Sequence, residues 1–178
     1  MKKITSVILA IALIFALAVT AMAAEIADCT VSADSVSATA GGTVTVPIRI
    51  SGNRGFTNFG IALDYDREQL ELLSIQTAEG ETPYLCGTTV AVNTQWTGTD
   101  EKTFGYVTAA LEEAATADGI LFTATFRVSG DFSGTAAVQP VVQYMRSNKR
   151  LLSVFDAIPV TTVSGTVSTV LVGDYDQN

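Results

Sequence analysis

The sequence predicts an all-β protein, a jelly-roll β-sandwich of about nine strands preceded by a signal peptide. Segments of alternating or β-branched apolar residues recur along the chain and are separated by turn residues about every eight to twelve positions. No amphipathic segment is long enough for a substantial helix. Two sheets packed face to face would bury one side of each alternating strand, so a sandwich is the expected architecture.

The first 23 residues have the pattern of a secretory signal peptide. A basic start at 1–3 precedes an apolar run at 7–19 and a small-residue cleavage site at 21–23. The alternative is a membrane anchor, but the apolar run is short for a hydrocarbon core of about 30 Å. We therefore expect no membrane insertion after cleavage and divide the chain into a signal peptide (1–23), one β-sandwich domain (24–172) and a short C-terminal segment (173–178).

The composition limits the possible functions. Ten basic residues against 18 acidic residues give a net charge of −8, which disfavours nucleic acid and anionic membrane surfaces as partners. The chain has no histidine, and so lacks the commonest general base and transition-metal ligand. Export would permit a disulfide between Cys29 and Cys86. The sequence does not show whether their Cα atoms come within reach, so bridged and free thiols both stay open.

The first strands are expected at 29–37, 43–50 and 58–65. Pro47 lies within the second, which indicates an edge position or a bulge because proline cannot donate to the ladder. The third alternates strictly. Its inward set is expected to be Phe59, Ile61, Leu63 and Tyr65, and its outward set Asn58, Gly60, Ala62 and Asp64.

A tight turn is expected to follow this third strand. Asp66 precedes Gln69 at capping-box spacing, which favours Asp66 as the cap of a helical turn. Apolar residues then start another strand at 70–75. The remaining strands are expected at 90–96, 104–111, 120–128, 136–144, 151–155 and 161–172.

The segment 104–111, FGYVTAAL, is apolar on both faces. In a single sandwich this indicates either full burial or an exposed apolar face. An exposed apolar face with a few hydrogen-bonding groups is what a protein-binding surface needs.

Three segments together resemble the cohesin family. GFTNFGIALDYDREQLELLSI (55–75) is similar to the family's third and fourth strands, GGTVTVPIRISG (41–52) to its second, and DGILFTATFRVSG (118–130) to its eighth. The resemblance covers roughly 30–172. It implies a non-catalytic module that binds dockerin domains on enzymes or scaffold proteins and so assembles extracellular polysaccharide-degrading complexes, the cellulosomes. It also implies secretion or attachment to the cell surface through a scaffold, indirect association with plant polysaccharide, no cofactor for the cohesin domain, and calcium on the partner dockerin.

The resemblance also implies a partner-binding face built from the third, fifth, sixth and eighth strands. Gly60 stands where many members carry aspartate, so we expect space for a bulky partner side chain and an altered choice of dockerin. The expected contact residues are Asn58, Gly60, Ala62, Trp96, Val107, Ala109, Leu111, Glu112, Leu121 and Thr123.

Two of these assignments have an alternative. Trp96 fits the core as well as the interface. Because both faces of 104–111 are apolar, Val107, Ala109 and Leu111 could face inward and leave Tyr106 and Thr108 outside.

The last residues, GDYDQN, resemble the start of a dockerin calcium loop. Asp174, Asp176 and Asn178 occupy positions 1, 3 and 5 of such a loop. Calcium needs six to eight oxygen ligands, so these three would bind it only if the loop continues beyond the given chain. The interpretation is a truncated dockerin-like start, and the alternative is an ordinary polar tail.

Other function classes are weaker. Clustered carboxylates at 64–71 and 112–113 would have to face each other across a sugar to act as a glycosidase, and no Ser/His or Cys/His pair is possible, so we expect no enzyme. The main alternative is a carbohydrate-binding module, but one tryptophan and five tyrosines offer few residues for a row of exposed aromatics. A third possibility is a spacer domain of a surface protein.

Overall fold

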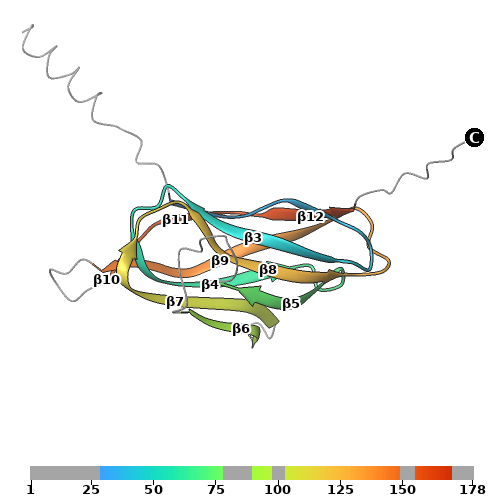
Figure 1. Cartoon of the computed structure of the whole chain (residues 1–178), viewed down its shortest axis with the longest axis horizontal. Coiled ribbons are helices and arrows are strands. Elements are labelled where there is room, and N and C mark those ends of the chain that lie inside the picture. The colour runs from blue at the N-terminus through green and yellow to red at the C-terminus, as the bar shows by residue number, and fades with distance from the viewer. Residues whose placement is uncertain (1–28, 78–89, 98–102, 149–154, 170–178) are drawn as a thin grey trace, which may run out of the picture.

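The computed structural model describes residues 29–77, 90–97, 103–148 and 155–169, and within them the chain forms two packed β-sheets (Figure 1). The expected all-β sandwich is confirmed. None of these residues belongs to a helix of the length and apolarity needed to cross a membrane. The signal peptide (1–23), Cys86 and the C-terminal segment with Asp174, Asp176 and Asn178 lie outside the described residues.

The first sheet has five strands in the order β11-β1-β3-β8-β5. All neighbours are antiparallel except β1 and β11, which run parallel. Its strands are β1 (Cys29–Ala33), β3 (Thr43–Ser51), β5 (Leu70–Gln76), β8 (Gly119–Val128) and β11 (Val160–Val163).

The second sheet has seven strands in the order β2-β12-β9-β4-β7-β6, with β10 also paired to β9. Here β2 and β12 are the parallel pair. Its strands are β2 (Val36–Ala38), β4 (Phe56–Tyr65), β6 (Val90–Thr97), β7 (Thr103–Ala115), β9 (Thr135–Asn148), β10 (Phe155–Ala157) and β12 (Gly165–Thr169).

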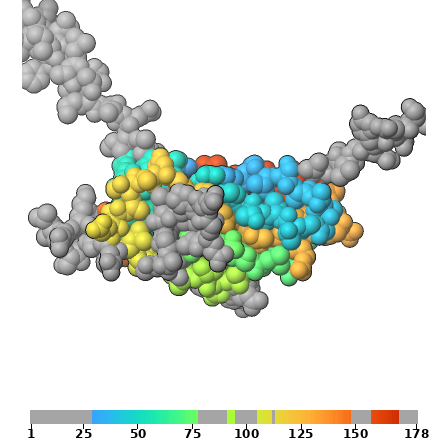
Figure 2. Space-filling view, in the orientation of Figure 1, coloured from blue at the N-terminus to red at the C-terminus, as the bar shows by residue number. Residues whose placement is uncertain are grey.

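Two segments expected as single strands are each split between the sheets. Residues 29–37 divide into β1 and β2, and residues 161–169 divide into β11 and β12. The chain passes from one sheet to the other between β1 and β2 and again between β11 and β12. These two crossing segments meet at Gly165, where a Cβ atom would lie 2.6 Å from the carbonyl oxygen of Ala33. Only glycine permits this approach. Strands from the two ends of the sequence therefore lie side by side, as the interleaved colours of Figure 2 also show.

The core lies between the sheets and is built from the inward sets of the alternating strands. Phe59, Ile61 and Leu63 of β4 are fully buried, as the alternation predicted, and Tyr65 packs against them half-buried. Phe59 meets Phe56 edge to face at 5.5 Å between ring centroids. Such pairs add to the burial of apolar area that stabilises the sandwich.

Pro47 lies in β3, which is an interior strand between β1 and β8. The Pro47 carbonyl accepts a hydrogen bond from the Asp34 amide at 2.9 Å, just beyond the last residue of β1. A residue's N–H and C=O point to the same side of a strand, so the missing N–H of Pro47 faces the end of β1. The position is therefore a local edge, although the strand as a whole is not.

Cys29 is buried at the start of β1 and is a free thiol. Burial is the main cause that raises its pKa; the nearby Arg54 lowers it and Asp118 raises it. A buried thiol that stays protonated is a poor nucleophile.

The turn between β4 and β5 is capped by Asp66, as expected. One carboxylate oxygen accepts hydrogen bonds from the Glu68 and Gln69 amides at 3.0 and 3.3 Å, and the Asp66 carbonyl accepts from the Leu70 amide at 2.8 Å. The turn brings β5 into the other sheet immediately after β4.

We expect Asp66→Ala to lower the free energy of unfolding by about 1 kcal/mol, because two turn amides lose their acceptor. Urea denaturation would measure the change. Glu68→Ala is the matched control, since its side chain is exposed on the same turn. Equal losses in the two variants would contradict the capping role.

Candidate functional site

The candidate site is the solvent-facing side of four adjacent strands, β9, β4, β7 and β6, in the second sheet (Figure 1). We call it the outer face. The strand registers and the alternation of side chains place these residues on it: Asn58, Gly60, Ala62 and Asp64 of β4, Ala91 and Asn93 of β6, Tyr106, Thr108 and Ala110 of β7, and Gln139, Val141, Tyr144 and Arg146 of β9.

Asn58 is half-buried on this face. It lies between Ala110 on β7 and Arg146 on β9 in the strand registers. Alanine on one side and a long side chain on the other leave its amide group with access to solvent. This is the exposure expected of a residue that hydrogen-bonds a partner.

Gly60 lies two residues further along β4, but the space above it is filled. A Cβ atom there would clash with the Tyr106 hydroxyl and would lie 2.5 Å from Cε1 of Tyr144. The expectation that Gly60 opens room for a bulky partner side chain is therefore wrong. Two tyrosines of the chain itself occupy that room, and the glycine is needed to accommodate them.

Ala62 also belongs to the outer face, between Tyr106 and Val141 in register. It is only 2% exposed, and it is not part of the core cluster. Its neighbours on the outer face therefore cover it. Of the three β4 residues expected to contact a partner, only Asn58 has an accessible side chain.

Tyr106, Thr108, Tyr144 and Arg146 form a group that we call the tyrosine cluster. The Tyr144 hydroxyl lies 2.7 Å from the Thr108 hydroxyl, and the guanidinium of Arg146 lies over the Tyr144 ring, 5.3 Å from its centroid. Desolvation raises the pKa of Tyr106, and the charge and hydrogen bond of Tyr144 raise it further. The Tyr144 ring is thus held in place by the contact of its hydroxyl with Thr108 and by a stacked cation, and Tyr106 interacts with Tyr144.

Val107 and Ala109 face the core and are fully buried, and Leu111 packs against the core half-buried. The expectation that these three face a partner is wrong. Val107 is paired with the core residue Ile61, so Val107 and the residues two positions away from it on β7 face inward. The alternative, which places Tyr106 and Thr108 outside, is the arrangement observed.

The expectation that Leu121 and Thr123 face a partner on this surface is also wrong. They lie on β8, which belongs to the other sheet between β3 and β5. A register shift between Ile48 and Arg49 makes Leu121 an additional residue, and it is buried in the core. Thr123 is opposite Pro47 and is 7% exposed.

The strand that completes the outer face is β9. Sequence reasoning assigns 120–128 to the partner face and leaves 136–144 out of it, so it does not find Tyr144 and Arg146. The signal that could have found them is the polar and charged end of 136–148, which suits a solvent-facing strand. Trp96 pairs with Phe104 in the register of β6 and β7, and Glu112 lies on β7, but the side chains of Trp96 and Glu112 lie outside the described part.

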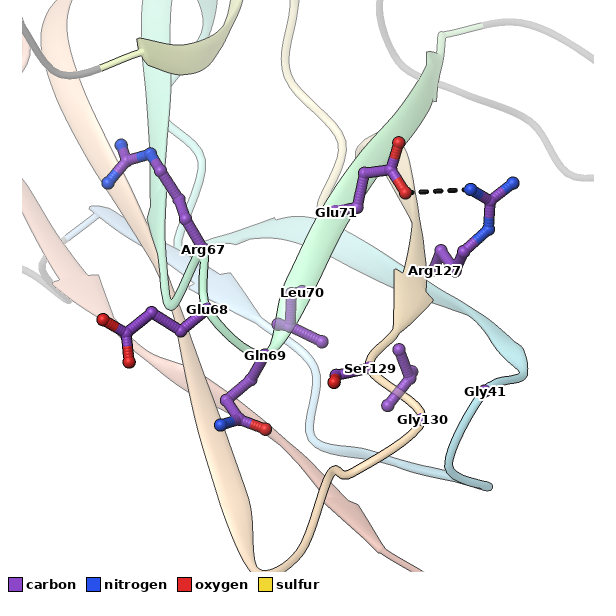
Figure 3. Close-up of a pocket in the computed structure, with 10 residues that line it drawn as sticks. Gly41, Arg67, Glu68, Gln69, Leu70, Glu71, Arg127, Ser129 and Gly130 are labelled. Atoms are coloured by element: carbon purple, nitrogen blue, oxygen red, sulfur yellow. Dashed lines mark hydrogen bonds and ion pairs between the residues drawn. The ribbon is translucent and has the colours of Figure 1, made fainter.

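A hollow lies away from this face, between the β4–β5 turn and the end of β8 (Figure 3). Its volume is about 230 Å³. Arg127 and Glu71 pair across its rim at 2.9 Å, and the side-chain oxygen of Gln69 is buried there without a hydrogen-bond partner. Among the described residues, no three histidine, cysteine or acidic side chains come close enough together to hold a metal ion.

Comparison with protein families gives one match, to the cohesin domain, over residues 29–168. The chain belongs to the cohesin family. A comparison with curated proteins finds no match.

Solved cohesins share the fold at low sequence identity. The seventh type I cohesin of ScaB from Pseudobacteroides cellulosolvens is 17% identical, with a TM-score of 0.69, over 85% of this chain and 97% of that one. The cohesin of a type I cohesin–dockerin complex from Clostridium thermocellum is 16% identical, with a TM-score of 0.65, over 80% and 99%. A non-cellulosomal cohesin from the archaeon Archaeoglobus fulgidus is 21% identical, with a TM-score of 0.62, over 81% and 92%.

We expect Gly60→Ala in this cohesin to lower the free energy of unfolding by about 1–3 kcal/mol, because the added methyl group must displace Tyr106 and Tyr144. Chemical denaturation would measure it. Gly130→Ala is the control, since a Cβ atom there meets nothing within 4 Å. Adding Tyr144→Ala to Gly60→Ala should recover part of the loss, and an unchanged stability of Gly60→Ala would contradict the packing described.

We expect the raised pKa of Tyr106 to fall toward its ordinary value in Tyr144→Phe, but not to reach it, because desolvation remains. NMR titration of ring-labelled tyrosine would follow it. A raised folded-state pKa contributes stability below the ordinary tyrosine pKa, and this is lost as pH rises through the folded-state pKa. Tyr106→Phe should therefore lose less stability than the wild type in that alkaline range. Identical titration curves in wild type and Tyr144→Phe would contradict the contact.

Proposed function

We propose that this cohesin is an exported, non-catalytic receptor module that binds a dockerin domain through the outer face. Several similar structures are cohesins solved with dockerins, among them the Clostridium thermocellum complex and a scaffoldin B cohesin of Acetivibrio cellulolyticus with the Cel5 dockerin. The partner would be a dockerin-bearing enzyme or scaffold protein, and the assembly an extracellular polysaccharide-degrading complex. The chain has no histidine, and the proposal assigns it no catalytic step.

The observation that carries the proposal is the contrast between the solvent-facing sides of the two sheets. The side of the first sheet is occupied by polar groups that satisfy one another: Thr45 with Thr125 at 3.1 Å, Arg49 with Asp34 at 2.8 Å and Arg127 with Glu71 at 2.9 Å. The outer face instead carries two half-buried tyrosines, an accessible asparagine and a stacked arginine. Tyrosine and arginine are enriched in protein interfaces, whereas threonine and acidic residues are not.

Calcium enters the proposal through the partner, because a dockerin is a calcium-loop domain. A calcium-dependent interaction would therefore come from folding of the dockerin and not from an ion bound to the cohesin sandwich. Secretion, or attachment to the cell surface through a scaffold, would bring the module to its partners. Association with plant polysaccharide would be indirect, through the bound enzyme.

The test is a pull-down from secreted proteins of a cellulosome-producing culture on the purified, immobilised chain, with calcium and with a chelator. We expect dockerin-bearing proteins to be recovered in calcium and lost in chelator. Retention of the purified chain on insoluble cellulose without any protein partner would instead favour the carbohydrate-binding alternative. If no dockerin is recovered and no cellulose is bound, the proposal is wrong.

We expect Asn58→Ala to weaken dockerin binding about ten-fold, because the partner loses a hydrogen bond in a desolvated contact. Calorimetry with a recovered dockerin would measure it. Thr45→Ala is the matched control, since Thr45 is exposed on the first sheet. Thermal unfolding should show both variants folded, and equal affinities of the two would mean that the partner binds elsewhere.

A further inference from the structure

Arg146 has a defined position on the outer face, near the end of β9 and beside the start of β4. It lies on β9 opposite Asn58 of β4, and its carbonyl accepts a hydrogen bond from the buried Thr57 hydroxyl at 3.3 Å. The main chain at Arg146 is therefore tied to β4 by the sheet and by a side chain. The exposed Arg146 side chain therefore extends from a fixed main-chain position beside Asn58, which we expect to contact a partner.

The guanidinium is also oriented before any partner arrives. It stacks on the Tyr144 ring at 5.3 Å, and that ring abuts Gly60 and is held by the Thr108 hydroxyl at 2.7 Å. Stacking occupies the flat face of the guanidinium and leaves the N–H groups at its edge available, which are the groups that grip a carboxylate in bidentate fashion. A side chain that is ordered in advance loses less entropy on binding.

The charge of Arg146 is uncompensated within the described residues. Arg49 and Arg127 are each paired with a carboxylate at 2.8 and 2.9 Å, whereas Arg146 contacts an aromatic ring and no described carboxylate. The described carboxylate on the same face, Asp64, lies 3.8 Å from Arg67. In a chain with a net charge of −8, this exposed cation on the outer face is distinctive.

There is also room for a side chain beside Arg146. A hollow of about 300 Å³ runs along β9 and is lined by residues 142–146, Ala157, Ile158 and Val160. Ala157 is exposed and is paired with Arg146 in the register of β10 and β9, so its methyl group suits the methylene groups of an acidic side chain whose carboxylate reaches the guanidinium. The hollow and the charge thus favour the same kind of group.

We propose that Arg146 is a specificity-determining residue of this cohesin and that it selects dockerins presenting an aspartate or glutamate to it. This inference rests on the proposed function. In place of the open space expected at Gly60, the contact to the partner is made on β9 by the Arg146 guanidinium, which stacks on the Tyr144 ring. A dockerin with a lysine or arginine at that position is rejected by like charge.

The test uses the dockerin of the Clostridium thermocellum complex, displayed on yeast with its exposed helix positions randomised and sorted in calcium against the purified chain. We expect the wild type to enrich acidic residues at one position about ten-fold or more. Arg146→Glu should enrich lysine or arginine at the same position, and Arg146→Gln should show no charge preference there. Arg127→Glu, the same charge change on the first sheet, should select as the wild type does.

The outcomes separate the inference from the function it rests on. If wild type and Arg146→Glu bind but enrich the same sequences, the inference is wrong and the dockerin-binding function stands. If no variant binds any displayed dockerin and the calcium pull-down also fails, both are wrong. Tyr144→Phe should keep the acidic preference and Tyr144→Ala should reduce it, and thermal unfolding of each variant shows that the comparison is between folded proteins.

Discussion

The close crossing at Gly165 is the constraint on which the sandwich depends. Near each end of the domain the chain leaves one sheet and enters the other, and the two crossings pass within contact of each other's main chain. Consequently the two segments run together in the same direction, β1 with β11 in the first sheet and β2 with β12 in the second. This shared path joins both sheets at one side and holds the core residues between them.

The composition of the outer face depends on a register shift in β9. Between Gly60 and Ile61 the partner on β9 changes from Tyr144 to Val142, so Gln143 is an additional residue. Odd-numbered residues face outward before the shift and even-numbered residues after it. Without this bulge, Tyr144 and Arg146 could not share a face with Gln139 and Val141, and bulges commonly re-aim side chains in this way near functional sites.

The sequence predicted those features that follow from local periodicity and failed where long-range register decides. The inward set of β4 and the Asp66 turn were predictable because alternation and capping are local patterns. Which side of β7 faces the core was not predictable, since both of its faces are apolar and only its pairing with β4 decides between them. The sheet to which 120–128 belongs and the bulge of β9 depend on pairing between distant segments, which alternation does not encode. Tyr144 and Arg146 were missed for that reason.

The filled space above Gly60 links the choice of partner to several positions at once. An aspartate at position 60 would have to come with the loss or movement of two tyrosines on two other strands. A change at one of these three positions disturbs the packing of the other two, which is a barrier to changing this part of the outer face in one step. Where several cohesins share one cell, such a barrier would insulate this receptor from the partners of its neighbours during evolution.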